Sequence, residues 1–171
     1  MPSVRCTMGG TLIPPILLSG EIVPQLTFNL ADLLNRKSDQ LLNAWLEAQP
    51  KSGRRLSAGE QQDASRKSRD FMEALKSAAS TEKLDDISGP GWNAIKKLLA
   101  ELSSRRAKDG YTPTETATFV LSLKEPLFAA LQEEGGMDTT HAVWQISQIL
   151  DKLSLYTMET FQKTREEVIL R

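Results

Sequence analysis

Apolar residues along this chain recur at steps of three and four positions, the spacing that gathers side chains on one face of an α-helix. The first such run covers about residues 29–49, and Pro50 ends it because the residue before a proline resists the helical conformation. Later runs cover about residues 57–79, 91–108 and 112–134, with glycine or proline between them. The pattern therefore predicts helices joined by short breaks.

Two of the predicted helix starts carry a capping box, in which a hydroxyl and a carboxylate satisfy free amides of the first turn. The boxes are Ser-x-x-Glu at 57–60 and Thr-x-x-Glu at 112–115. Pro126 falls inside the helix that follows the second box. Because proline has no amide hydrogen to donate, we expect it to kink that helix near Ser122.

The last predicted helix begins after Gly135-Gly136, with Asp138 as its expected N-cap, and no stop signal precedes Arg171. A helix of about 33 residues is ~50 Å long at a rise of about 1.5 Å per residue. That length exceeds what a compact domain of this size needs. The sequence thus predicts a terminal helix that extends past the bundle.

Along this last helix, apolar and small residues follow the alternating steps of a coiled coil. The apolar content decreases after Leu153, so we expect the helix from about Tyr156 to protrude and to pair with a second copy or lead into a further domain. A terminal helix that folds back on the bundle is the alternative. The residues predicted to form this dimer or linker contact are Ile146, Leu150, Leu153, Thr157 and Phe161.

Composition supports an all-α fold of about five helices. Leucine occurs 24 times and alanine 15 times, whereas valine and isoleucine together reach 13, so the β-branched residues that favour strands are scarce. A length of 171 residues indicates one domain with an extension. We expect an irregular N-terminal arm over residues 1–25, a helical domain over 26–155 and a linker helix over 156–171.

Charge and cysteine content exclude several classes of protein. The 21 Lys and Arg residues balance 22 Asp and Glu residues, which argues against binding of nucleic acid or a membrane surface by bulk charge. Because Cys6 and His141 are the single cysteine and histidine, an internal disulfide and a Cys/His zinc site are excluded. Two prolines interrupt the apolar run at 12–18, so no signal peptide is predicted, and the lone thiol fits a cytoplasmic protein.

The sequence contains no motif for catalysis or metal binding. It has no phosphate-binding loop, no nucleophile elbow and no calcium loop. The adjacent carboxylates Asp85 and Asp86 are expected to be solvated, because catalytic acids need burial and a perturbing neighbour. Basic groups at 54–55, 66–69 and 105–108 are interleaved with acids and are expected to lie on solvated helix faces. We therefore predict no catalytic residue, no metal site and no enzyme.

His141 is the residue that suggests a cofactor, since a single histidine can hold a haem iron. Trp144, Phe119 and Phe128 would then form the walls of the haem pocket. The other interpretation, which we favour, is an exposed or hydrogen-bonded histidine in the first turn of the last helix. We accordingly expect no cofactor and keep a haem-based gas sensor as the alternative.

Three segments of the chain resemble the N-terminal domain of RsbR-type proteins, the RsbT co-antagonists of bacterial stressosomes. They are LLNAWL at 41–46, TETATFVLSLKEPL at 114–127 and LYTMETFQKTREEVI at 155–169. The resemblance extends from about residue 29 to residue 171. None of the three segments is a catalytic motif. The resemblance therefore depends on the order and spacing of all three segments.

This resemblance implies an all-helical, globin-like sensory domain that usually lacks haem and forms a homodimer. In the family, the long final helix passes into a C-terminal STAS domain, which assembles with RsbS-like partners and captures the switch kinase RsbT. The chain is thus expected to be one domain of a longer protein, and the family's phosphorylated threonines to lie outside it.

A packed pair of helices has discrete arrangements, so a dimer joined by the last helix can transmit a shift in helix position. We expect a signal or a partner to bias such a shift. Replacement of Leu150 and Leu153 by charged residues is then expected to abolish dimerisation and to leave helicity largely intact.

Overall fold

The computed structural model describes residues 28–50, 55–135 and 139–170. These residues form α1 (Leu30–Arg36), α2 (Ser38–Ala48), α3 (Ala58–Thr81), the 3-10 turn η2 (Pro90–Trp92), α4 (Asn93–Lys108), α5 (Pro113–Leu121), α6 (Lys124–Glu134) and α7 (Thr139–Ile169). No strand occurs in the described residues, which confirms the all-α prediction. The predicted arm over 1–25, Cys6 and the expected cap Asp138 lie outside the described residues.

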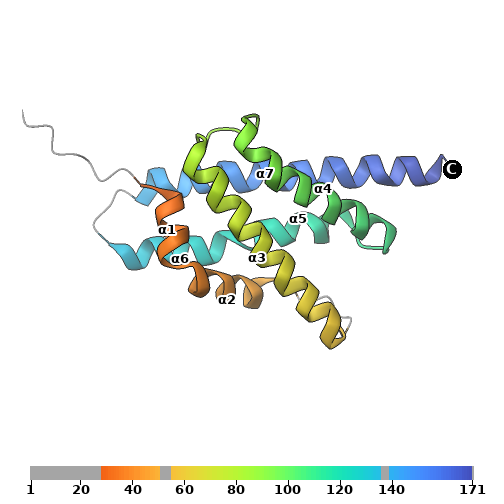
Figure 1. The fold of residues 1–171 in the computed structure, drawn as a ribbon, viewed down its shortest axis with the longest axis horizontal. Coiled ribbons are helices and arrows are strands. Elements are labelled where there is room, and N and C mark those ends of the chain that lie inside the picture. Colours follow the sequence, from red (N-terminus) through yellow and green to blue (C-terminus); the bar gives the residue numbers. More distant parts are fainter. Residues whose placement is uncertain (1–27, 51–54, 136–138, 171) are drawn as a thin grey trace, which may run out of the picture.

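Helix α7 follows the long axis of the molecule, and the other helices pack along it and on one another (Figure 1). It has 31 residues, which confirms the prediction of a long last helix. Its main neighbours are α4 and α5, and it also contacts α6. Helices α1 and α2 pack on α3, and α2 also contacts α6. The C-terminal end of α7 extends past the end of α4 (Figure 1).

Both predicted capping boxes are present. Before α3, the Ser57 hydroxyl accepts a hydrogen bond from the Glu60 amide (3.2 Å), and the Glu60 carboxylate accepts one from the Ser57 amide (2.8 Å). Before α5, Thr112 and Glu115 form the same pair of hydrogen bonds, at 3.2 and 2.7 Å. These bonds fix where the two helices start, because they satisfy amides that have no partner inside the helix.

Two of the five expected helices are each divided in two. The first breaks at Lys37, between α1 and α2, where neither proline nor glycine marks the sequence. This turn directs Arg36 and Lys37 toward the end of α6, to which both are ion-paired. The fourth breaks between α5 and α6, near Ser122, where Pro126 predicts a kink.

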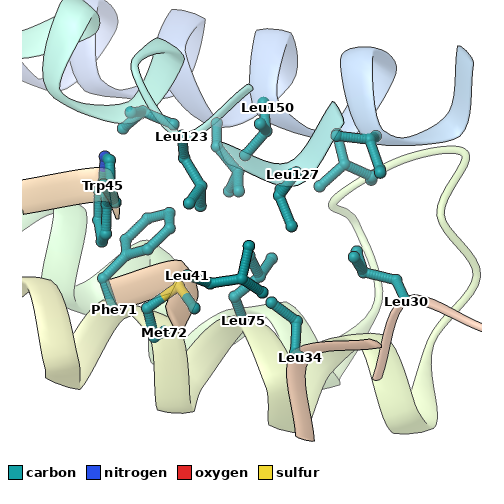
Figure 2. Packing of buried hydrophobic residues seen from close by; sticks show 14 of the residues in the cluster. Leu30, Leu34, Leu41, Trp45, Phe71, Met72, Leu75, Leu123, Leu127 and Leu150 are labelled. Atoms are coloured by element: carbon teal, nitrogen blue, oxygen red, sulfur yellow. The ribbon is translucent and has the colours of Figure 1, made fainter. Parts of the chain in front are cut away.

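Trp45 lies fully buried in the core (Figure 2). Its ring centroid is 5.2 Å from that of Phe71 and 4.9 Å from that of Phe119. Its indole Nε1 donates hydrogen bonds to the Phe119 carbonyl (3.1 Å) and to the Ser122 hydroxyl (2.9 Å). These bonds satisfy a polar group that is costly to bury alone, and they join α2 to the junction of α5 and α6.

Leucines from α1, α2, α3, α6 and α7 continue the core to one side of Trp45 and Phe71 (Figure 2). The labelled members include Leu30, Leu34, Leu41, Leu75, Leu127 and Leu150. All of them belong to one hydrophobic cluster, so the described helices share a single core.

Candidate functional site

Helix α7 carries the residues that the sequence singles out for contact with a second chain. The structure buries them inside their own chain, where none is more than 1% exposed: Ile146, Leu150, Leu153, Thr157 and Phe161. A side chain that its own chain covers cannot contact a second chain without repacking. In the described structure these residues hold α7 on its own bundle. Their predicted contact with a second chain stays a prediction.

The opposite side of α7 exposes large apolar side chains. Trp144 is 62% exposed, Leu155 64% and Met158 39%, and we call these three residues the outer face. Trp144 and Leu155 lie eleven residues apart, about three helical turns, so they share one side of the helix. Met158 follows about one turn later. The eleven-residue spacing is the sequence signal for this face, but periodicity alone does not distinguish a buried stripe from an exposed one.

The buried side of α7 changes in character along the helix. It is mainly aliphatic as far as Leu153, and from there the buried residues include Ser154, Thr157 and Thr164, which we call the hydroxyl face. Each of these three hydroxyls donates to a backbone carbonyl of α7 itself, at 2.7, 2.6 and 3.1 Å. Short side chains bonded to their own helix interlock less with neighbouring helices than leucines do.

Contact between α7 and the bundle continues to Thr164. The hydroxyl of Thr164 lies 2.9 Å from the hydroxyl of Ser104 in α4. Residues 165–170 beyond it are exposed. Helix α7 thus remains packed on the bundle well past Tyr156, the residue at which the linker helix is expected to begin.

Ion pairs accompany the outer face. Lys124 at the start of α6 lies 2.6 Å from Asp151 (Nζ to Oδ1), and Lys163 lies 2.9 Å from Glu159 (Nζ to Oε1). The hydrogen bond from Lys163 to Glu159 raises the pKa of Lys163. Such exposed pairs contribute little to stability, but they leave these charges already paired next to the apolar side chains.

His141 is exposed in the first turn of α7. The side chains expected to form haem-pocket walls do not gather around it, since Trp144 faces solvent and Phe119 packs on Trp45. Phe128 packs against the hydrophobic core. The described side chains therefore give no geometric support to a haem site at His141, and the expected absence of a cofactor stays a prediction.

The adjacent carboxylates Asp85 and Asp86 lie at the surface. The Asp86 carboxylate accepts hydrogen bonds from the amide and the hydroxyl of Ser88 (2.7 and 2.6 Å), and these bonds lower the pKa of Asp86. No three His, Cys, Asp or Glu side chains of the described residues are grouped as they would be around a metal ion. Nor is any helix in the described part of the chain long and apolar enough to cross a membrane.

Comparison with known protein families gives one match. The family model described as "RsbT co-antagonist protein rsbRD N-terminal domain" matches residues 37–171. The chain belongs to this family. The match to the RsbRD N-terminal domain begins just before α2 and includes all of α7. It confirms the resemblance carried by the three sequence segments. No curated protein and no solved structure matches the chain significantly.

Membership of the RsbRD N-terminal domain family identifies the chain as a regulatory stressosome domain, and this is not a known enzyme family. The features of α7 lie inside the matched range: an aliphatic buried side, a hydroxyl face and an apolar outer face. Helix α7 is therefore the candidate functional element of this RsbRD domain.

Proposed function

We propose that this domain is the non-enzymatic sensory and dimerisation part of an RsbR-type stressosome protein. It receives a stress signal and relays it through α7 to a STAS domain. That STAS domain assembles with RsbS-like proteins and controls the release of an RsbT-like switch kinase in the cytoplasm. The observation that carries the proposal is the family match over residues 37–171, which includes the whole of α7.

The outer face of α7 suits a contact between two copies of the domain. Trp144, Leu155 and Met158 are large apolar side chains exposed on one side of the helix. Aromatic residues and methionine are enriched at protein interfaces. The nearby charges of Asp151 and Glu159 are paired within the chain, so covering the outer face leaves neither carboxylate without a partner.

The hydroxyl face suits a helix that shifts. The first half of α7 is held by aliphatic side chains such as Ile146 and Leu150, which interlock with the core. The second half contacts the bundle through the fully buried ring of Phe161 and through Ser154, Thr157 and Thr164, so fewer aliphatic side chains hold it than hold the first half. A signal that moves the end of α4 would therefore move the end of α7.

The dimer contact is tested with Leu155→Glu in the complete chain, by size-exclusion chromatography with light scattering. We expect the wild type to have the mass of a dimer and the variant that of a monomer. Lys83→Gln is the matched control, because it changes the net charge of the chain by the same amount at an exposed residue outside α7. A dimer mass retained by Leu155→Glu, or a wild type that is already monomeric, contradicts this interface.

The sensory role is tested in the natural protein that carries the domain, assembled with its RsbS-like and RsbT-like partners. We expect removal of residues 28–155 to leave the STAS assembly intact and to abolish stress-dependent release of the kinase. Kinase release that responds normally to stress without the helical domain contradicts the sensory role.

A further inference from the structure

A cavity of about 280 Å³ opens between α3, the C-terminal end of α4 and α5. Its walls include the apolar side chains of Leu56, Leu102 and Phe119, together with the charged side chain of Arg106. This volume lies just below the usual range of about 300–1,000 Å³ for ligand pockets, so it suits a small molecule. A concave site with an apolar lining and a few polar groups is where small molecules bind.

Arg106 enters the cavity because it continues the buried side of α4. Ile95, Leu99 and Leu102 are buried, and Arg106 follows them at the next step of four. Its guanidinium carbon lies 5.0 Å from the ring centroid of Phe119 and 5.2 Å from that of Tyr111. The expectation of a solvated basic face is therefore wrong for Arg106, although Arg105 beside it has a side chain that is 62% exposed.

The turn after α4 brings Tyr111 onto Arg106. Gly110 has a φ of 83°, a left-handed conformation that other residues rarely adopt, and the Tyr111 amide donates to the Arg106 carbonyl (3.0 Å). The rings of Tyr111 and Phe119 thereby both lie within cation–π distance of the guanidinium. Two aromatic faces hold the cation in place.

No carboxylate of the described residues is found within ion-pair distance of Arg106, although the charge of Glu115 attracts its guanidinium. Arg36, Arg66 and Arg105 each lie within ion-pair distance of a carboxylate. The guanidinium of Arg106 instead donates to the backbone carbonyl of Glu115 (3.3 Å). Burial lowers the pKa of Arg106, as expected where water is partly excluded from a cation. A partly desolvated guanidinium with unused donors favours an incoming anion.

We propose that this cavity binds a small organic monocarboxylate, whose carboxylate pairs with Arg106 and whose apolar part lies against Leu102 and Phe119. A planar guanidinium matches a carboxylate with two parallel hydrogen bonds. The neighbouring aromatic and leucine side chains favour a ligand with an apolar body over a fully polar anion.

The charges around the cavity restrict the ligand to a single negative charge. The acidic residues in the walls are Glu60, Asp63, Asp109 and Glu115. Asp63 is paired with cations, and Glu60 and Glu115 bond the amides of their capping boxes. Pairing with Lys67 lowers the pKa of Asp63 and capping lowers that of Glu115, so these two carboxylates disfavour a second negative charge on the ligand, whereas one carboxylate is matched by Arg106.

Binding in this cavity goes beyond the proposed sensory function and does not depend on it. Only the use of ligand binding as a signal depends on the proposed sensory function. Ser104, two residues before Arg106, contacts Thr164 of α7, so an occupied cavity would act on the same end of α4. If no ligand binds, the proposal for the cavity fails and the sensory role is untouched. If ligand binds and kinase release ignores it, only the signalling use fails.

The test is an NMR titration of the complete chain with benzoate and butyrate, which follows the side-chain Nε–H signal of Arg106. We expect a saturable shift with at least one of these carboxylates and none with benzamide, the neutral counterpart of benzoate. Inorganic phosphate is expected to bind more weakly than either carboxylate. Arg106→Gln is expected to weaken carboxylate binding by about 10- to 100-fold, the loss of a charge-assisted pair.

Arg165→Gln is the matched control, because it removes an exposed guanidinium on α7 that does not line the cavity, and its affinity is expected to equal that of the wild type. No saturable shift of the wild-type Arg106 signal with either carboxylate overturns the proposal. So does an equal shift with benzamide, or equal loss of binding in both variants. The wild-type signal decides the question even if Arg106→Gln does not fold.

Discussion

Two buried polar side chains in this domain show how hydrogen bonding determines the free-energy cost of burying a polar group. Trp45 is fully buried, and its indole nitrogen has two hydrogen-bond acceptors. Ser103 is also fully buried, and among the described residues its hydroxyl is the buried side-chain group without a hydrogen-bond partner. A buried hydroxyl without a partner loses its hydration and gains nothing in return.

We therefore expect Ser103→Ala to stabilise the domain by about 1 kcal/mol, since it removes the unpaired hydroxyl and places a better helix former in α4. Urea denaturation of the complete chain measures the change in free energy of unfolding. Ser104→Ala is the matched control one position later, and it loses the contact with Thr164. A Ser103→Ala variant less stable than the wild type contradicts this account of Ser103.

At the scale of the element, the two sides of α7 predict opposite results for the same substitution. Leu153 is fully buried in the core cluster, and Leu155 is 64% exposed. Leu153→Glu places a carboxylate among apolar side chains and leaves a packing defect, at a cost of about 3–5 kcal/mol or more. We expect this variant to lose most of its helical signal in far-ultraviolet circular dichroism.

Leu155→Glu is expected to retain the helical signal, because the carboxylate faces water. Comparison of Leu153→Glu with Leu155→Glu therefore separates an effect on folding from an effect on association. Charged residues at Leu150 and Leu153 do not separate these two effects, because both positions are buried. A folded Leu153→Glu variant would show that the second half of α7 is not held by the core as described.

Helix boundaries were predictable from the sequence wherever a capping box or a proline marks them. The capping boxes at Ser57 and Thr112 define starts, and Pro126 marks the break between α5 and α6. The break at Lys37 has no such mark, because it coincides with ion pairs to residues almost a hundred positions away. Periodicity reports only local spacing, so a break that depends on distant partners is invisible to it.

The candidate site was less predictable for a related reason. The sequence identifies the last helix as a long one and gives the correct family, but the residues that it predicts for contact with a partner are buried within the chain. Buried and exposed apolar stripes share the same period, and only the packing of α4 and α5 decides between them. The sequence spacing of Arg106 indicates that it lies on the buried side of α4, because it continues the spacing of Leu99 and Leu102. Only the three-dimensional structure shows that its neighbours are aromatic rings and not a carboxylate within ion-pair distance.

At the scale of the whole molecule, ion pairs join two distant parts of the chain. The guanidinium of Arg36 donates to both carboxylate oxygens of Glu134, at 2.5 and 2.9 Å. Lys37 lies 2.6 Å from Glu133 (Nζ to Oε2). The corner between α1 and α2 is thereby held against the end of α6, shortly before the chain enters α7.

These ion pairs make the stability of the domain decrease at acidic pH. The hydrogen bond from Arg36 lowers the pKa of Glu134. The Arg36–Glu134 pair therefore contributes fully to stability above the unfolded carboxyl pKa of about 4.3. This contribution is lost as the pH falls through the lower pKa of the folded state. We expect Glu134→Gln to have a lower Tm than the wild type near neutral pH. The two Tm values should converge in acid.

Thermal unfolding followed by circular dichroism over a series of pH values measures that difference. Glu125→Gln is a control that removes an exposed carboxylate from the first turn of the same helix. A difference in Tm between Glu134→Gln and the wild type that stays constant from neutral pH to acid contradicts the role of the Arg36 pair.

The exposure of Trp144 gives the domain its own optical reporter. The chain has three tryptophans, and Trp45 and Trp92 are at most 1% exposed, whereas Trp144 is 62% exposed. A dissolved quencher such as acrylamide therefore reaches the indole on α7 and spares the two in the core. Fluorescence that becomes protected from quenching marks the moment when the outer face is covered, whichever molecule covers it, without any label attached to the protein.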